Sequence, residues 1–110
     1  MLSREQILAA DDIRFVDVAV PEWGGAVRVK VINGLERQHF ETLMRGRQGE
    51  DIRSAIVAAS VVGDDGALLF TFADADALGR KSWKALERIA DAAAELNKLT
   101  DSTVEATVKN

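Results

Sequence analysis

The chain has 110 residues, no cysteine and a formal net charge of −4 at pH 7, from 14 basic and 18 acidic residues. Its length is typical of one domain, and the acidic balance argues against a nucleic-acid backbone as its main partner. The lack of cysteine excludes disulfides, thiolate zinc sites and cysteine nucleophiles. We therefore expect one domain, residues 1–110, in which residues 1–11 form a lead-in with one or two helical turns.

The sequence shows neither a signal peptide nor a membrane span. Its beginning, MLSREQILAADD, is charged throughout and lacks an apolar core. The apolar stretch from Ala55 to Val62 is far too short to cross a bilayer. We expect an intracellular protein with no membrane partner.

Two valine-rich runs flank the only proline of the chain. Residues 16–20 and 27–31 alternate with a period of two, which predicts two strands with their valines on one face. Pro21 suits the end of a strand because it donates no hydrogen bond, and Gly24 and Gly25 permit the backbone angles of a tight turn. These features predict a β-hairpin with Trp23 at its tip.

The helices are predicted from caps followed by apolar residues at helical spacing. Asn33 with Glu36 resembles a capping box. The stripe after it consists of Leu35, His39, Phe40, Leu43 and Met44. Ser82 caps the clearest helix. Its stripe, which we expect to pack in the core, consists of Trp83, Leu86, Ile89, Ala90, Ala93 and Leu96.

Between these helices the pattern is less regular. Residues 52–62 suit a helix or a buried strand, and their length and alanine content favour a helix. Residues 63–66 predict a turn, and residues 67–70 an extended piece. Thr71 with Asp74 predicts a capped short helix that ends at Gly79. A last helical turn is predicted from residue 100 to residue 108.

These elements predict an α+β fold. An N-terminal β-hairpin, extended by a third short strand if residues 67–70 join it, packs against several α-helices.

Side chains able to do chemistry are few and isolated. His39 is the only histidine, and we interpret it as a packing or boundary residue of its helix. The acidic pairs at 11–12, 50–51 and 64–65 lie beside glycines or segment boundaries, where Asp favours turns and caps. Asp74 begins a stretch like a calcium loop, but Leu78 and Ala85 occupy two positions that require oxygen ligands. We expect no catalytic residue, no metal site and no cofactor.

Binding has a better candidate in Trp23. At a hairpin tip stiffened by Pro21, this side chain would be an apolar anchor with little side-chain freedom to lose. The alternative, that Trp23 folds back over the core, remains open. The candidate partner-binding residues are Pro21, Trp23, Gly24, Gly25, Phe70 and Phe72.

The order of features resembles the tail assembly chaperones of long-tailed, siphovirus-like phages and prophages. The resemblance covers residues 11–110, although TFADAD after Phe70 is less acidic than the family pattern. It rests on the hairpin VPEWGG with the strand at 27–31, on DGALLFT at 65–71 with Asp74, on Leu78-Gly79 and Lys81-Ser82, on Leu96-Asn97, and on the terminal Lys109-Asn110.

The resemblance implies a non-catalytic chaperone in the host bacterial cytoplasm, absent from the mature virion. Such a protein binds the tape measure protein, keeps it soluble, promotes tail tube assembly, and associates with itself. A frameshift-extended form, for which the closing Lys-Asn would mark the short product, would reach the major tail tube protein. Two alternatives stay open: a permanent virion component, such as a head–tail or tail-completion protein, and an enzyme or metal-dependent regulator.

Overall fold

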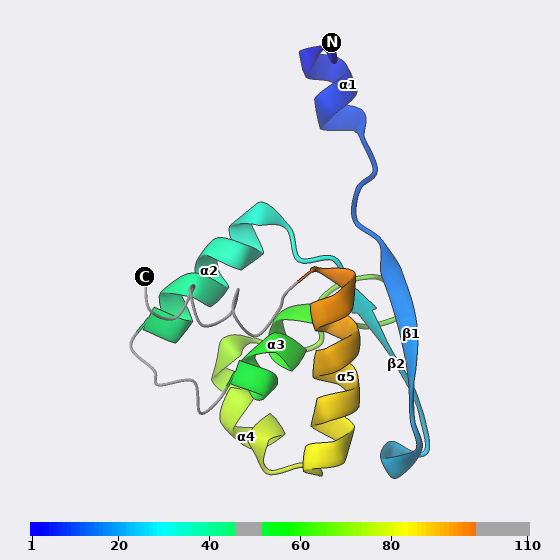
Figure 1. Cartoon of the computed structure of the whole chain (residues 1–110), viewed down its shortest axis with the longest axis vertical. Helices are drawn as coiled ribbons and strands as arrows, with labels where there is room; N and C mark the ends of the chain where they lie inside the picture. Colours follow the sequence, from blue (N-terminus) through cyan, green and yellow to red (C-terminus); the bar gives the residue numbers. More distant parts are fainter. Residues whose placement is uncertain (46–51, 99–110) are drawn as a thin grey trace.

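The computed structural model describes residues 1–45 and 52–98. It contains a three-stranded antiparallel sheet and a set of helices, so the predicted α+β fold is confirmed (Figure 1). The third short strand is formed by Val61–Val62 and not by residues 67–70, from which it was predicted. In chain order the elements are α1 (Arg4–Ala9), β1 (Phe15–Val20), the 3-10 turn η1 (Pro21–Trp23), β2 (Gly25–Lys30), α2 (Gly34–Arg45), α3 (Ile52–Ser60), β3 (Val61–Val62), the 3-10 turn η2 (Phe72–Asp74), α4 (Ala75–Gly79) and α5 (Trp83–Leu96).

The predicted hairpin is confirmed as β1 and β2. Val16 is paired with Val29 and Val18 with Val27, so these valines share one face of the sheet. β3 pairs with the other side of β2, which leaves β1 as an edge strand. The tip closes through Gly24, whose φ of 74° lies in the left-handed region that glycine adopts without strain.

Helices α2 to α5 pack on one side of the sheet, around α3. Helix α3 contacts α2, α4 and α5, and it is buried from residue 54 to residue 60. Helix α5 contacts α3 as well as β1 and β2, and so joins the helices to the sheet (Figure 1). The largest fully buried side chains are Phe40, Met44, Ile89, Val20, Val29, Val57, Val61 and Ser60.

The stretch from residue 52 to residue 62 is mostly helical, as its alanine content indicates. The helix ends at Ser60, and Val61 and Val62 form β3 because Val29 and Arg28 of β2 offer them a strand partner. The turn at 63–66 is confirmed by the hydrogen bond from the Gly66 N–H to the Gly63 carbonyl, 3.0 Å. Leu68 then bridges to Val62, so the predicted extended piece touches the sheet.

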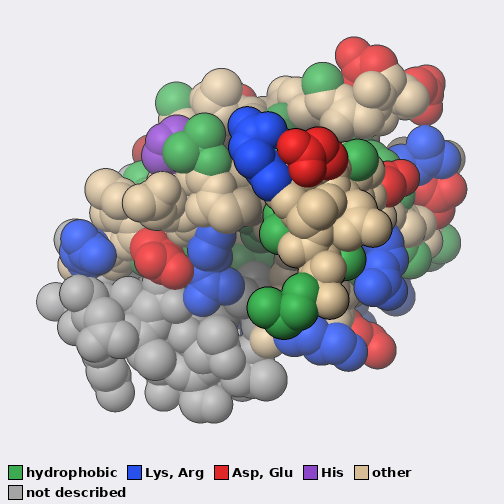
Figure 2. All heavy atoms as spheres, turned by 90° about the horizontal axis from the view of Figure 1, so that it is seen from above, with side chains coloured by type: hydrophobic (Ala, Val, Ile, Leu, Met, Phe, Trp, Pro, Cys, Tyr) green, Lys and Arg blue, Asp and Glu red, His purple; other side chains and the backbone are tan. Residues whose placement is uncertain are grey.

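Two interpretations of apolar stripes are wrong. Trp83 is 61% exposed, because it is the first residue of α5 and the buried part of the helix begins only at Ala85. His39 is exposed and does not pack in the core, since the buried residues of α2 are Phe40 and Met44. Its imidazole lies open on the surface in the space-filling view (Figure 2).

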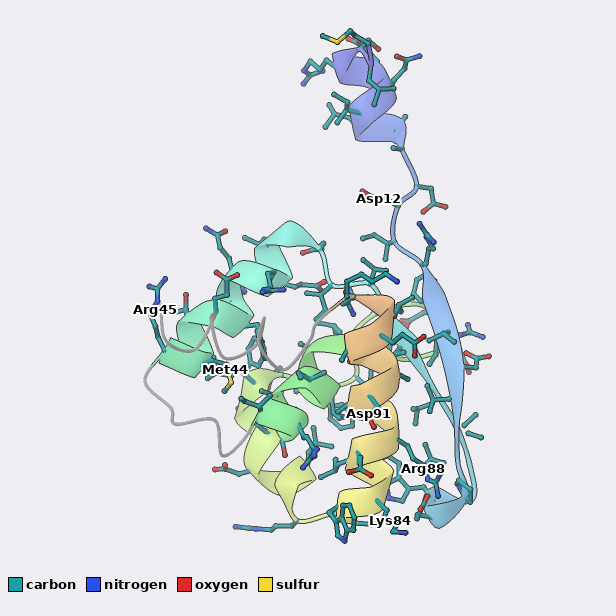
Figure 3. All side chains as sticks on the ribbon, in the orientation of Figure 1. Asp12, Met44, Arg45, Lys84, Arg88 and Asp91 are labelled. Atoms are coloured by element: carbon teal, nitrogen blue, oxygen red, sulfur yellow. The ribbon has the colours of Figure 1, made fainter. Side chains whose placement is uncertain are left out.

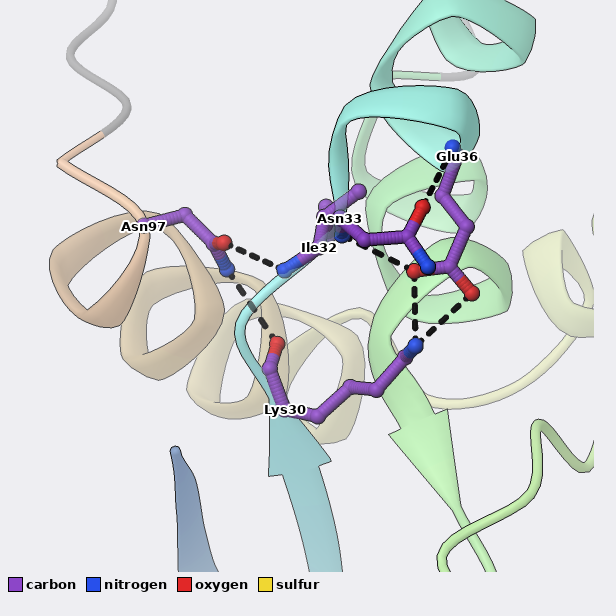
Figure 4. Close-up of polar contacts among 5 residues, drawn as sticks. All are labelled: Lys30, Ile32, Asn33, Glu36 and Asn97. Carbon is purple, nitrogen blue, oxygen red and sulfur yellow. Dashed lines mark hydrogen bonds and ion pairs between the residues drawn. The ribbon is translucent and has the colours of Figure 1, made fainter. Parts of the chain in front are cut away.

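The predicted start of α2 is confirmed. The Glu36 N–H donates to the Asn33 side chain at 2.8 Å, and the Asn33 N–H donates to Glu36 Oε1 at 3.0 Å. Glu36 also accepts hydrogen bonds from Lys30 Nζ at 2.6 and 2.7 Å (Figure 4). The Lys30 side chain is 10% exposed, so this ion pair closes a largely buried junction between β2 and α2.

Asn97, at the end of α5, stabilises the same junction between β2 and α2. Its Oδ1 accepts a hydrogen bond from the Ile32 N–H at 2.7 Å, and its Nδ2 donates to the Lys30 carbonyl at 3.3 Å (Figure 4). The side chain thus satisfies backbone groups of the chain leaving β2 while it ends the helix. The end of α5 therefore meets the junction of β2 and α2, which lies 65 residues earlier in the sequence at Ile32.

Several predictions fall outside the described residues. They concern Gly46 as the stop signal of α2, the acidic pair Glu50-Asp51, the helical turn from residue 100 to residue 108, and the closing Lys109-Asn110.

Candidate partner-binding surface

An apolar hollow of about 370 Å³ lies beside the hairpin tip. Its residues come from the hairpin, from the turn before α4 and from α4 itself, so segments about 50 residues apart build it together. We call it the hairpin-tip surface. Its lining residues are Trp23, Phe70, Asp74, Ala77, Leu78 and Lys81.

Trp23 occupies a position between the two predicted alternatives. Its side chain is 39% exposed, so it is neither a free tip nor a core residue. The short turn η1 begins at Pro21 and is closed by Gly24, whose N–H donates to the Pro21 carbonyl at 3.1 Å. Because the turn is fixed in this way, the indole is held as one wall of the hollow.

The structure brings two of the six candidate residues to this surface. Phe70 lines the hollow with Trp23, and Phe72 is partly buried against the core. Pro21, Gly24 and Gly25 are exposed beside Trp23 and shape its turn. Sequence reasoning missed the contributors from α4, Ala77 and Leu78, and also Lys81, because their spacing suggests only a short helix.

An ion pair holds the hairpin tip against α5. Arg88 Nε lies 3.1 Å from Glu22 Oε1 and 3.2 Å from Oε2. Arg88 and Lys84 lie near the tip in the side-chain view (Figure 3). The pKa of Glu22 lies below its usual value of 4.5, first through a hydrogen bond to its own backbone and then through Arg88. The depressed pKa shows that the folded state favours the carboxylate.

We expect this shift to be measurable by NMR titration of Glu22. Stability from a depressed carboxyl pKa is present above the unfolded value, about 4.5, and is lost as the pH falls through the folded value. Arg88→Ala should raise the folded pKa only part of the way back, because the backbone hydrogen bond remains. Arg53→Ala, which removes the exposed partner of Glu87, is the control and should leave Glu22 unchanged. A full return to 4.5 in Arg88→Ala would contradict this explanation.

The exposure of Trp83 adds an apolar side chain that sequence reasoning placed in the core. The ammonium of Lys84 lies 5.8 Å from the centre of the indole, within the range of a cation–π contact. The only feature of the sequence that could have indicated the exposure of Trp83 is its position directly after the cap Ser82. A first-turn residue is often beyond the layer against which its helix packs.

Two of the acidic residues considered for cation binding accept hydrogen bonds from the backbone. Asp65 Oδ1 accepts a hydrogen bond from the Ala67 N–H at 3.0 Å, and Asp74 Oδ2 accepts one from the Thr71 N–H at 2.8 Å. In the described ranges no three His, Cys, Asp or Glu side chains come together in a group that could hold a metal ion. Within the same ranges, no helix has both the length and the apolar content to cross a membrane.

Comparison with known proteins identifies the fold. Neither family models nor curated proteins match the sequence. Among solved structures, the chain matches the tail assembly chaperone of bacteriophage HK97, with a TM-score of 0.58. The chain has the fold of that chaperone. The match covers 88% of this chain and 92% of the chaperone, at 15% sequence identity.

The shared fold confirms the resemblance seen in the sequence at the level of architecture. At 15% identity the side chains that make contact with a partner are not carried over by the match. The partner-binding surface therefore rests on the exposure and packing of this chain's own residues.

Proposed function

We propose that the protein is a non-catalytic tail assembly chaperone. In this proposal it binds the tape measure protein in the host cytoplasm, keeps it soluble while tail tube subunits assemble, and leaves before the particle is complete. The observation that carries the proposal is the fold shared with the HK97 tail assembly chaperone across 88% of the chain. Association with further copies of itself belongs to the same proposal.

The hairpin-tip surface supplies a physical mechanism. Trp23 and Phe70 offer apolar contact area on an acidic body, with the buried Leu78 behind them. Asp74 and Lys81 provide polar groups at the same hollow. Its volume, about 370 Å³, lies within the range of ordinary ligand clefts and suits a few side chains of an amphipathic helix. By binding exposed apolar segments, the chaperone lowers the concentration of the form that aggregates.

Trp23→Ala is expected to weaken capture of the tape measure protein at least tenfold, since aromatic anchors carry a large share of interface energy. The variant should keep its helical circular dichroism, because the side chain is 39% exposed. The measurement is binding of purified tape measure segments to the immobilised protein.

Leu35→Ala is the matched control, because Leu35 is 64% exposed and lies on α2, outside the hairpin-tip surface. Equal loss in both variants would contradict the assigned surface. Unfolding of Trp23→Ala would make Trp23 a core residue. Recovery of the protein from purified particles would favour the alternative of a permanent virion component.

A further inference from the structure

The N-terminal arm, residues 1–9, has no buried residue in the described part of the chain. Every residue of α1 is exposed, and the helix stands away from the body (Figure 1). Its apolar side chains are nevertheless prominent: Leu2 is 73% exposed, Ile7 57% and Leu8 69%. The arm thus presents apolar surface that residues 10–45 and 52–98 leave uncovered.

The arm is too short to be stable as a helix by itself. Isolated helices shorter than about 12–15 residues are marginal in water, and α1 has 6 residues. A capping box supports its first turn, through Ser3 and Gln6. A cap of this kind stabilises a helix only modestly. A docking partner for Ile7 and Leu8 would supply the missing stabilisation.

The hairpin-tip surface matches the arm in chemistry. A second hollow of similar size, near the base of the arm, has a mixed lining. The charged Asp12, Arg14 and Arg37 lie there beside the apolar Val31, Ile32 and Leu96. At the hairpin tip, Trp23, Phe70 and Leu78 form apolar walls. Burial of the aliphatic side chains of Ile7 and Leu8 is therefore more favourable at the hairpin-tip surface.

Geometry separates the arm from the tip of its own hairpin. β1 leads away from the arm, and its 6 residues separate the arm from the tip. At about 3.3 Å per residue, the strand is about 17–20 Å long. The connection at 10–14 is 5 residues long, and only when fully extended does it span a distance close to the length of β1. The arm would have to double back along the whole strand to reach its own tip, whereas a second copy is under no such constraint.

The geometry points to a head-to-tail contact in which the arm of one copy docks into the hairpin-tip surface of a second copy. Ile7 and Leu8 enter the hollow between Trp23, Phe70 and Leu78. This contact would be the interface of the self-association that is part of the proposed function, and the inference rests on that proposed function. Because arm and hollow are different surfaces, the contact is heterologous.

The test uses the full-length chain alone, in sedimentation velocity over a range of concentrations. The double variant Ile7→Ser, Leu8→Ser is expected to raise the dissociation constant of self-association at least tenfold, and Trp23→Ala should do the same. Leu35→Ser removes an equally exposed leucine from α2 and should leave association unchanged. Circular dichroism of each variant checks that the body remains folded.

Mixing the two impaired proteins gives the sharper result. The arm variant keeps an intact hollow and Trp23→Ala keeps an intact arm, so an equal mixture should form one-to-one pairs although neither protein associates alone. Absence of pairing in the mixture would overturn the proposal. The proposal would also be overturned if both variants still associated, as expected if the β1 edges of two copies pair. A wild-type protein that stays monomeric would overturn it as well. None of these experiments involves the tape measure protein. If the head-to-tail contact is disproved, binding of the tape measure protein is still tested separately by the capture experiment.

Discussion

Glu36→Ala is expected to lower the free energy of unfolding by about 3 kcal/mol, as for removal of one partner from a buried ion pair. The Lys30 ammonium, with a side chain 10% exposed, would be left without the carboxylate that lies 2.6 Å away. The same substitution removes the acceptor of the Asn33 N–H at the start of α2. Urea unfolding monitored by circular dichroism gives the measurement.

Glu41→Ala is the matched control on the same helix. Its ion pair with Arg37, 2.9 Å between Nε and Oε1, is partly solvated, with side chains 38% and 31% exposed. We expect a loss of about 0.5 kcal/mol or less, as for other i,i+4 pairs. Equal losses for the two variants would show that burial at the junction of β2 and α2 does not matter.

Phe40→Ala is expected to cost about 3–5 kcal/mol, the usual range for truncating a buried phenylalanine. Phe40 is 1% exposed and, with Met44, makes the buried face by which α2 joins the core. For a domain whose total stability is about 5–15 kcal/mol, this loss is a large fraction. The midpoint of thermal or urea unfolding should fall accordingly.

Leu35→Ala provides the comparison for this substitution. Leu35 lies one turn and a half earlier on α2 and is 64% exposed. Its removal should change the free energy of unfolding by no more than about 0.5 kcal/mol. A small effect of Phe40→Ala would mean that α2 contributes little to the cooperative core.

Local signals in the sequence were sufficient for most elements. The alternation of valines specifies the hairpin because each strand has one face against the helices. Asn33 and Ser82 mark helix starts because their side chains accept the first free backbone N–H groups. The alternation and the caps each involve only a few neighbouring residues, so they can be recognised in the sequence before the fold is known.

The candidate site depends on tertiary packing and was only partly predictable. Trp23 and Phe70 were chosen for their apolar character, whereas their meeting at one hollow follows from the docking of the hairpin tip beside α4. Periodicity likewise places Trp83 on the apolar side of α5 but does not say where the neighbouring layer ends. The strand β3 formed from Val61 and Val62 because β2 was available to pair with them.

The most direct test of the proposed function is the solubility of the proposed client, a phage tape measure protein, expressed with and without this chain. Clarified lysates are compared by the fraction of tape measure protein that remains in the supernatant. The account predicts that most of it is soluble when the wild-type chain is present and aggregated when it is absent. A soluble fraction that is the same in both cultures would contradict the chaperone function.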